Sequence, residues 1–289
     1  MNEFWLSLIN GISNGAVYGL VGLGLVIIYR STDVVNFAIG TIALGCMYLA
    51  LGIYEAGIPL ALALLAGIVV CSAVGVTARE VVIRPLGPGA LFSALVVTMG
   101  LSLILEELTR EIWGGEPRQF PSLVQGDVTL GGATFTNQRL LVIPVAAVAM
   151  LAVAYMFKKT PLGSAMRAVA ESHNTATLLG IKPQRVARVA WALGMGLAAL
   201  GAAMVVPTTG LAIGGFAAIL FRSFAGIFLG GLTSMYGAVV GGVVVGVLDN
   251  LAATYVSASW RDTFVFSLVI LVLLVRPQGL FGEKSFARV

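Results

Sequence analysis

Residues 4–29 read FWLSLINGISNGAVYGLVGLGLVIIY and contain no charged side chain. A helix of about 20 consecutive apolar residues is long enough to cross the hydrocarbon core of a bilayer. Similar apolar runs follow at about residues 36–54, 59–78, 90–106, 140–157, 189–206, 236–255 and 263–275. Because membrane-length runs recur along the chain, the sequence predicts an all-α fold, a polytopic bundle of transmembrane helices.

The composition indicates one membrane-embedded domain over residues 1–289. Hydrophobic residues make up 58% of the chain and charged residues 10%, whereas a soluble domain carries about 25% charged residues. Mean hydropathy is +0.99. The outside of a bundle in lipid needs no polar cover, so a bilayer accommodates such a chain. Cys46 and Cys71 fall inside apolar runs and are expected to be buried free thiols.

The segment at residues 208–232 is ambiguous. It is apolar, yet it holds Arg222 near its middle and six glycines around that arginine. A central arginine costs about 2.5–3.5 kcal/mol on insertion scales, and irregular backbone at membrane depth is tolerated only when it is buried in protein or lines a cavity. We therefore expect about eight to ten membrane segments, with a broken or re-entrant segment near 208–232.

The placement of cations predicts the orientation. Most of the 17 Lys and Arg residues fall around Arg30, around Arg79 and Arg84, within residues 158–188, or in the tail after residue 275. Cytoplasmic loops carry an excess of Lys and Arg. Residues 107–139 mix cations with carboxylates and are predicted to be periplasmic. The amino terminus is then periplasmic and the carboxyl terminus cytoplasmic.

The most polar segment reads KKTPLGSAMRAVAESHNTATLLGIKPQR at residues 158–185. Thr160 or Ser164 can cap a short helix at residues 165–171, and Asn174 can start a second short turn that ends at Gly180. The small side chains of this segment leave a surface that another protein can approach closely. From the pattern alone, an ordinary amphipathic connector between spans is the alternative.

The first apolar run carries two stripes. Glycines recur every four residues on one of them, which lets another helix approach closely; they are Gly11, Gly15 and Gly19, followed by Gly22. Asn10, Asn14 and Tyr18 have the same spacing about 100° around the helix. This polar stripe either lines a substrate pathway or supplies hydrogen bonds between helices. Arg222 likewise either lies in the pathway or forms a structural pair with an acidic group or a helix C-terminus.

Five stretches resemble one family, the branched-chain amino acid ABC transporter permeases, and within it the H-type subunit. TPLGSAMRAVAESHNTATLLGI at residues 160–181 is similar to the cytoplasmic coupling loop of that family. The other four are NGISNGAVYGLVGLGLVIIYRSTDVVNFAIG (10–40), VIRPLGPGALFSALVVTMGLSLILEE (82–107), FRSFAGIFLGGLTSMYGAVVGG (221–242) and RPQGLFGE (276–283). They occur in the order of the family over nearly the whole chain. Ile39 stands where the family often has His, which puts the usual ligand of the family in doubt, and Arg222 stands where Lys is common.

The resemblance implies a permease subunit of an ATP-binding-cassette importer, forming part of the translocation pore for branched-chain or related amino acids. It implies a second, M-type permease subunit, two ATP-binding subunits that use the ATP, and a periplasmic substrate-binding protein as partners. This chain itself is expected to bind no cofactor. The expected ATPase-coupling residues of the loop are Gly163, Ala165, Arg167, Ala168, Glu171 and Gly180. Gly163 and Ala168 are expected to make the closest contact with the ATP-binding subunit. The expected pathway residues are Asn10, Asn14, Tyr18 and Arg222.

Other functions are disfavoured by the residues, with two alternatives left open. Related systems import urea, amides or carboxylates. A self-sufficient secondary transporter or channel commonly keeps intramembrane carboxylates, which the predicted spans almost lack at their centres. No enzyme, metal or nucleic-acid function is expected, because the chain has no GxxxxGK[ST] phosphate loop, no metal-ligand spacing and no nucleophile with a base, and its cations lie between apolar spans. Asp249 and Asn250 are expected near the outer surface, either solvated or part of an outer gate.

Overall fold

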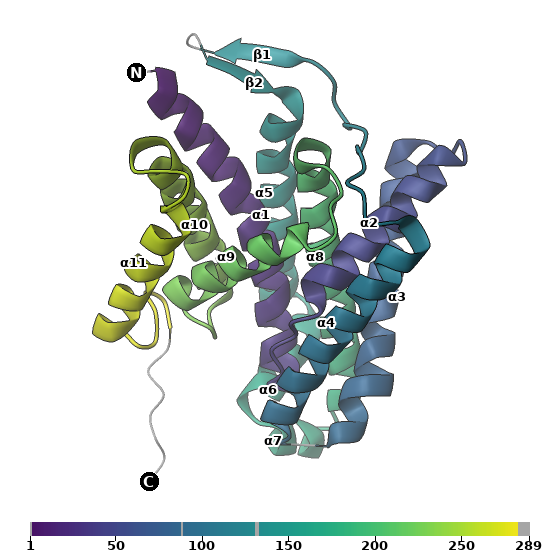
Figure 1. Cartoon of the computed structure of the whole chain (residues 1–289). Helices are drawn as coiled ribbons and strands as arrows, with labels where there is room; N and C mark the ends of the chain where they lie inside the picture. The colour runs from purple at the N-terminus through teal and green to yellow at the C-terminus, as the bar shows by residue number, and fades with distance from the viewer. Residues whose placement is uncertain (1, 88, 131–132, 283–289) are drawn as a thin grey trace.

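The computed structural model describes residues 2–87, 89–130 and 133–282, and it is helical over most of that length (Figure 1). The longer helices are α1 (Asn2–Thr32), α3 (Leu60–Ala78), α4 (Leu91–Trp113), α5 (Asn137–Lys159), α8 (Pro183–Thr209) and α10 (Met235–Tyr255). The shorter ones are α2 (Ile39–Glu55), α6 (Pro161–Glu171), α7 (His173–Leu178), α9 (Gly215–Gly230) and α11 (Arg261–Val275). A π-helical turn, η1 (Arg79–Ile83), and a 3₁₀ turn, η2 (Arg84–Leu86), extend α3.

Six helices in the described residues are long and apolar enough to cross a membrane: α1, α3 with its extension, α4, α5, α8 and α10. The polytopic helical bundle is therefore confirmed, but the expected eight to ten segments are not. The difference comes from α2, α9 and α11, which have 17, 16 and 15 residues. At 1.5 Å per residue they reach only about 23–26 Å, short of the roughly 30 Å hydrocarbon core.

Helix α1 lies at the centre of the bundle, and its glycine stripe faces α10. A Cβ added at Gly15 would lie 2.7 Å from Cα of Val243, and one added at Gly11 would lie 2.7 Å from Cα of Val247. From the other side, a Cβ at Gly246 would collide with the backbone of Gly15. The two backbones therefore touch, as small residues every fourth position permit. The close helix approach predicted from this stripe is confirmed.

Helix α9 lies across the bundle rather than along it (Figure 1). Gly210 and Gly214 precede it with φ of +76° each, and Gly231 follows it with φ of +111°, a backbone region that favours glycine. A Cβ at Gly226 would lie 2.8 Å from Cα of Gly242 on α10. The broken segment expected near 208–232 is therefore a short helix, bounded by glycines and packed against protein.

A β-hairpin between α4 and α5 was not predicted. Strands β1 (Asp127–Leu130) and β2 (Ala133–Thr136) pair antiparallel. Ahead of them, Arg118 and Leu211 exchange two backbone hydrogen bonds of 2.8 Å each. This bridge ties the long connection after α4 to the break before α9, and Figure 1 shows hairpin and connection at the end of the bundle where α1 begins.

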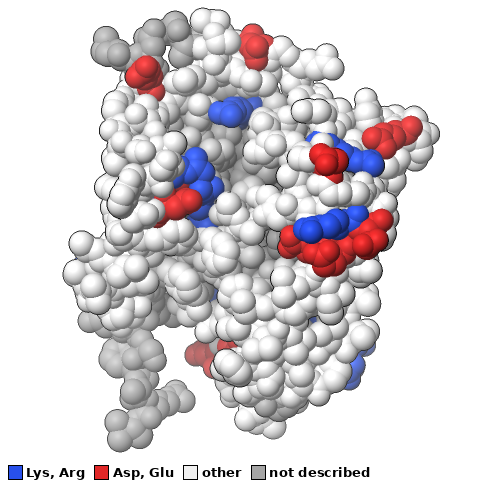
Figure 2. Space-filling view, viewed as in Figure 1, with Lys and Arg blue, Asp and Glu red and all other residues white. Residues whose placement is uncertain are grey.

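The bundle surface is largely apolar. Side chains such as Leu65 on α3, Leu103 on α4 and Leu151 on α5 are 56%, 67% and 68% exposed. Figure 2 shows that uncharged residues make up most of the face viewed there, with Lys and Arg mostly beside Asp or Glu in small clusters. An apolar exterior of this kind suits a bundle surrounded by lipid.

Candidate functional site

Helices α6 and α7 form a compact pair at the opposite end of the bundle from the hairpin (Figure 1). The hydroxyl of Thr160 accepts a hydrogen bond of 3.2 Å from the Gly163 amide and caps α6. The hydroxyl of Ser172 accepts one of 3.2 Å from the Thr175 amide and caps α7. Two short helices were predicted here and are confirmed, although Ser172, not Asn174, caps the second one.

The predicted coupling residues do not share one face of this pair. Gly163 is buried, and a Cβ there would lie 2.5 Å from Cα of Phe157. It therefore packs against α5 in this chain, and the exposed side of α6 is formed by other residues. The sequence could not show which side of α6 faces the bundle. Ala165 and Ala168 are half-buried and pack against the hydrophobic core of the bundle.

The remaining predicted residues of the loop are exposed. They are Arg167, Glu171 and Gly180, the last with φ of +79°. Arg167 donates to the Phe157 carbonyl and, at 3.1 Å, to the Ser164 hydroxyl. Leu178 and Leu179, at the tip of α7, are 88% and 73% exposed. The sequence analysis missed this apolar pair, although two leucines within a polar segment were a visible signal.

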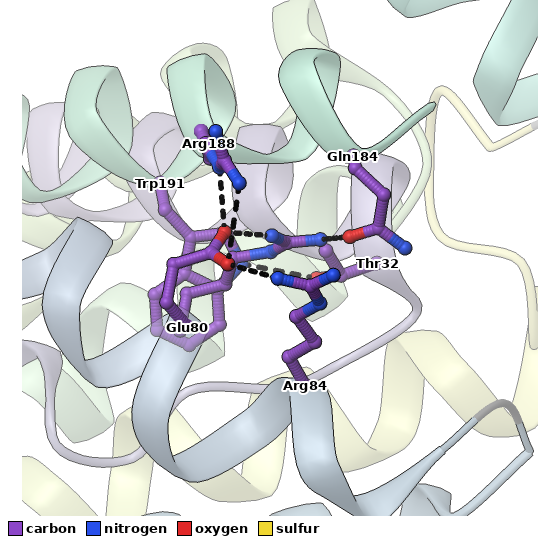
Figure 3. Close-up of polar contacts among 7 residues, drawn as sticks. Thr32, Glu80, Arg84, Gln184, Arg188 and Trp191 are labelled. Atoms are coloured by element: carbon purple, nitrogen blue, oxygen red, sulfur yellow. Dashed lines mark hydrogen bonds and ion pairs between the residues drawn. The ribbon is translucent and has the colours of Figure 1, made fainter. Parts of the chain in front are cut away.

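The carboxylate of Glu80, in the turn that extends α3, is hydrogen-bonded to α8, the helix that follows this loop (Figure 3). Glu80 accepts a 2.8 Å hydrogen bond from Arg188 Nε of α8 and a 2.9 Å bond from Arg84 Nη1. Arg79 also pairs with Glu80 and donates to Gln184 of α8. The arginine side chain at position 79 is 6% exposed. We call Arg79, Glu80, Arg84, Gln184 and Arg188 the Glu80 cluster.

The Glu80 cluster lies where α3 changes into the π-helical turn η1, a deviation that is frequent at functional sites. Beside it, Trp191 of α8 donates to the Thr32 hydroxyl at the end of α1, at 3.3 Å (Figure 3). The ends of α1 and α3 are therefore both tied to the first turns of α8. Only residues 179–182 separate α7 from α8.

A second polar site surrounds a cavity of about 270 Å³ between α1, α8 and α9. Its wall includes Asn14 and Tyr18 of the predicted polar stripe together with Arg222, so the structure brings these three together. Asn10 does not line it. Further polar lining residues are Arg139, Thr208, Thr209 and Arg261, and apolar ones include Val205 and Phe216.

Arg222 sits in a cluster of four charged residues beside this cavity. Its Nη2 lies 2.6 Å from Asp262 Oδ1, and its Nε lies 3.2 Å from Asp249 Oδ1 in an ion pair without hydrogen-bond geometry. Arg261 Nε lies 3.4 Å from the same Asp249 oxygen, and the Tyr18 hydroxyl donates to the other oxygen at 3.4 Å. We call Arg222, Asp249, Arg261 and Asp262 the Arg222 cluster.

The Arg222 cluster corrects one expectation and resolves another. The Asp249 side chain is 1% exposed, so of the two alternatives expected for it, solvation at the outer surface is wrong and a role in an outer gate stays a prediction. Its arginine partners come from α9 and α11, and no local pattern in the sequence indicates that these helices meet α10. Arg222, with a side chain 9% exposed, faces protein and not lipid. The structural pair and the pathway were alternatives, yet Arg222 both forms the pair and lines the cavity.

Among the described residues, no group of three or more His, Cys, Asp or Glu side chains could hold a metal ion. His173 is exposed at the start of α7. Cys46 and Cys71 are free and buried, as expected.

Comparisons with known proteins find one family that matches nearly the whole chain. Residues 7–274 match the family described as branched-chain amino acid transport system / permease component. The chain is 29% identical to the high-affinity branched-chain amino acid transport system permease protein LivH of Escherichia coli and to LivH of Salmonella typhimurium; each match covers 99% of this chain and 98% of the relative. It is 28% identical to the permease protein BraD of Pseudomonas aeruginosa, over 98% of this chain and 97% of that protein. No solved structure matches the chain.

Proposed function

Because the chain belongs to the family of branched-chain amino acid transport system permease components, we propose that it is a permease subunit of an ATP-binding-cassette importer for branched-chain amino acids. The observation that carries this proposal is the capped α6–α7 pair with Leu178 and Leu179 exposed at its tip. An importer without its own ATPase site must receive mechanical work through a protein contact. A rigid helix pair with an apolar tip is suited to be that contact.

The partners follow from the same proposal. Two ATP-binding subunits dock on the α6–α7 pairs of two permeases, and a periplasmic binding protein delivers the substrate. The second permease is the M-type subunit. ATP is bound and hydrolysed by the partners and not by this chain. The α6–α7 pair and the carboxyl terminus face the cytoplasm, because cytoplasmic segments of membrane proteins are rich in Lys and Arg.

We propose nine passes through the inner membrane, six by long helices and three by the segments that contain the short helices α2, α9 and α11, in which flanking non-helical backbone packed against protein completes the crossing. Two contacts support this count. The first turn of α10 lines a pocket together with Arg30 and Lys158, which end α1 and α5. Its last turn returns to the start of α1, where the Thr254 and Ser7 hydroxyls lie 3.1 Å apart. Helix α9 and the glycine-bounded segments on either side of it together therefore bring the chain from one side of the bundle to the other.

The cavity lined by Asn14, Tyr18 and Arg222 is the proposed substrate pathway within this subunit. Two of its three arginines, Arg222 and Arg261, already pair with aspartates, so Arg139 is the one suited to the carboxylate of an amino acid. Val205 and Phe216 offer apolar wall to an aliphatic side chain. An importer for a small neutral amide would have no use for an arginine at position 139. For that reason branched-chain amino acids are favoured over urea or amides.

The test uses the transporter assembled with its ATP-binding subunits in liposomes, with labelled leucine delivered by the binding protein. Uptake should require ATP and should fall at least tenfold in the Leu178→Asp variant, because a charge at the apolar tip opposes docking. Asn174→Asp places the same charge on the exposed start of α7 and serves as the matched control. Full ATP-dependent uptake by the Leu178→Asp protein would refute the docking role of α7.

A further inference from the structure

A pocket near the α6 end of the bundle is lined by cations that the transport site does not use. Its volume is about 390 Å³, and it lies between α1, α5, α6 and the first turn of α10. Arg30, Lys158 and Arg167 all line it, each from a different helix. Three separate elements thus direct positive charge at one pocket.

These cations have no acidic partner within the part of the chain that the structure describes. No ion pair there involves Arg30, Lys158 or Arg167, and no described carboxylate lines the pocket. Arg30 and Lys158 each complement the C-terminal dipole of their own helix. The helix dipoles explain why Arg30 and Lys158 lie at helix ends. They do not explain why both line the same pocket as Arg167.

The other wall of the pocket is apolar and open to the outside of the bundle. Leu151 of α5 and Val240 of α10 line it and are 68% and 42% exposed. Next to them, Tyr155 and Tyr236 are 67% and 56% exposed, and Lys158 Nζ lies 5.3 Å from the Tyr236 ring centroid. Exposed tyrosines beside a lysine are typical of the level where lipid headgroups meet the hydrocarbon core. The exposed apolar side chains of Leu151 and Val240 adjoin that level.

We propose that this pocket binds the phosphate headgroup of an anionic phospholipid of the inner leaflet, with one acyl chain along Leu151 and Val240. The leaflet rests on the orientation that belongs to the proposed function. Basic pockets between transmembrane helices on the cytoplasmic side are suited to acidic headgroups, and each Lys or Arg near the surface strengthens the attraction. Since Arg167 lies on α6, a bound lipid would join the coupling helix to α1, α5 and α10.

The experiment measures lipid retained by the full-length permease, alone and in the assembled transporter. The protein is exchanged into nanodiscs of equal phosphatidylglycerol and phosphatidylcholine, and the lipids that stay bound in detergent are counted by native mass spectrometry. Wild type should retain phosphatidylglycerol selectively. The Arg30→Gln/Lys158→Gln variant should lose that selectivity by roughly 30-fold, since two cations are removed. Lys182→Gln/Arg185→Gln removes two exposed cations outside the pocket and should retain it.

Several results would overturn the proposal. One is equal retention of both lipids by wild type, and another is unchanged retention by the pocket variant. Displacement of the lipid by millimolar inorganic phosphate would assign the pocket to a free anion, and loss of the lipid on assembly would assign it to the second permease. If the double variant elutes as aggregate, Lys158→Gln alone is used, because that side chain is exposed. Lipid binding by the permease alone needs neither ATP nor leucine, so the failure of this proposal is distinguishable from the failure of the transport function.

Discussion

Two arginine–carboxylate clusters lie at different levels of the bundle, and they differ in balance and burial. The Arg222 cluster joins two arginines to two aspartates, and its central pair is nearly inaccessible. The Glu80 cluster joins three arginines to one glutamate, and two of those arginines are about half exposed. A balanced, buried cluster is stable in a single arrangement, whereas a partly exposed cluster with surplus cations can exchange partners. The Arg222 cluster is therefore suited to hold its helices in one arrangement, and the Glu80 cluster is suited to a contact between helices that move relative to each other.

The fixed character of the Arg222 cluster depends on the glycine contact between α1 and α10. Gly246→Val would place a side chain against the backbone of Gly15 and force the two helices apart. We expect the loss to exceed about 3 kcal/mol, the upper end for an overpacked core, and the protein to disappear from the inserted, monodisperse fraction in fluorescence-detected size exclusion. Gly100→Val is the control, because nothing lies within 4 Å of a Cβ at Gly100. Normal yield of the Gly246→Val protein would show that the contact is not needed.

Arg222→Leu tests the balanced cluster itself. Removing the arginine leaves Asp249 buried beside only Arg261, and breaking a buried pair costs about 3–5 kcal/mol. Thermal unfolding of the purified protein should show that loss, and leucine uptake should cease.

The double variant Arg222→Leu/Asp249→Leu separates the two roles of Arg222. Replacing both partners removes the uncompensated charge, so thermal stability should return towards wild type. Uptake should stay absent if Arg222 contacts the substrate. Uptake that recovers together with stability would leave the residue a structural role only.

Among these variants, Glu80→Gln should lower the stability least. It should affect the coupling of ATP hydrolysis to uptake more than it affects stability. The side chain is 22% exposed, so the loss of its ion pairs is screened, and we expect about 1–3 kcal/mol in thermal unfolding. ATP-driven uptake should fall more than stability does, because α8 loses its tie to α3. Glu107→Gln is the control, since its pair with Arg110 is 3.6 Å long and exposed. If the Glu80→Gln and Glu107→Gln variants transport equally well, the contact between α3 and α8 through the Glu80 cluster has no role in coupling.

The fold was predictable from the sequence wherever the signal was local. The apolar runs at 59–78 and 236–255 became α3 and α10 within a residue, because a membrane-spanning helix must satisfy its backbone internally. The two short helices after Lys159 were also readable from a capping residue and a glycine. The β-hairpin was missed because its strands are four residues each and lie in a polar stretch.

The sites were predictable only in part, because their residues meet through tertiary packing. Asn14 and Tyr18 were found together since they are one turn apart on α1. Glu80 and Arg188 lie 108 positions apart, and nothing in either neighbourhood indicates the other. Likewise, the hydropathy of residues 215–230 does not indicate that α9 lies across the bundle. The hydropathy of a segment determines whether it enters the membrane, and its packing partners determine its direction.

The balance of the Arg222 cluster has an electrical consequence. Moving one elementary charge through the membrane potential involves about 2.3 kcal/mol per 100 mV. Two arginines and two aspartates that shift together carry no net charge, so the voltage does no work on them. The resting potential of the cell therefore neither drives nor opposes a movement of this cluster as a unit.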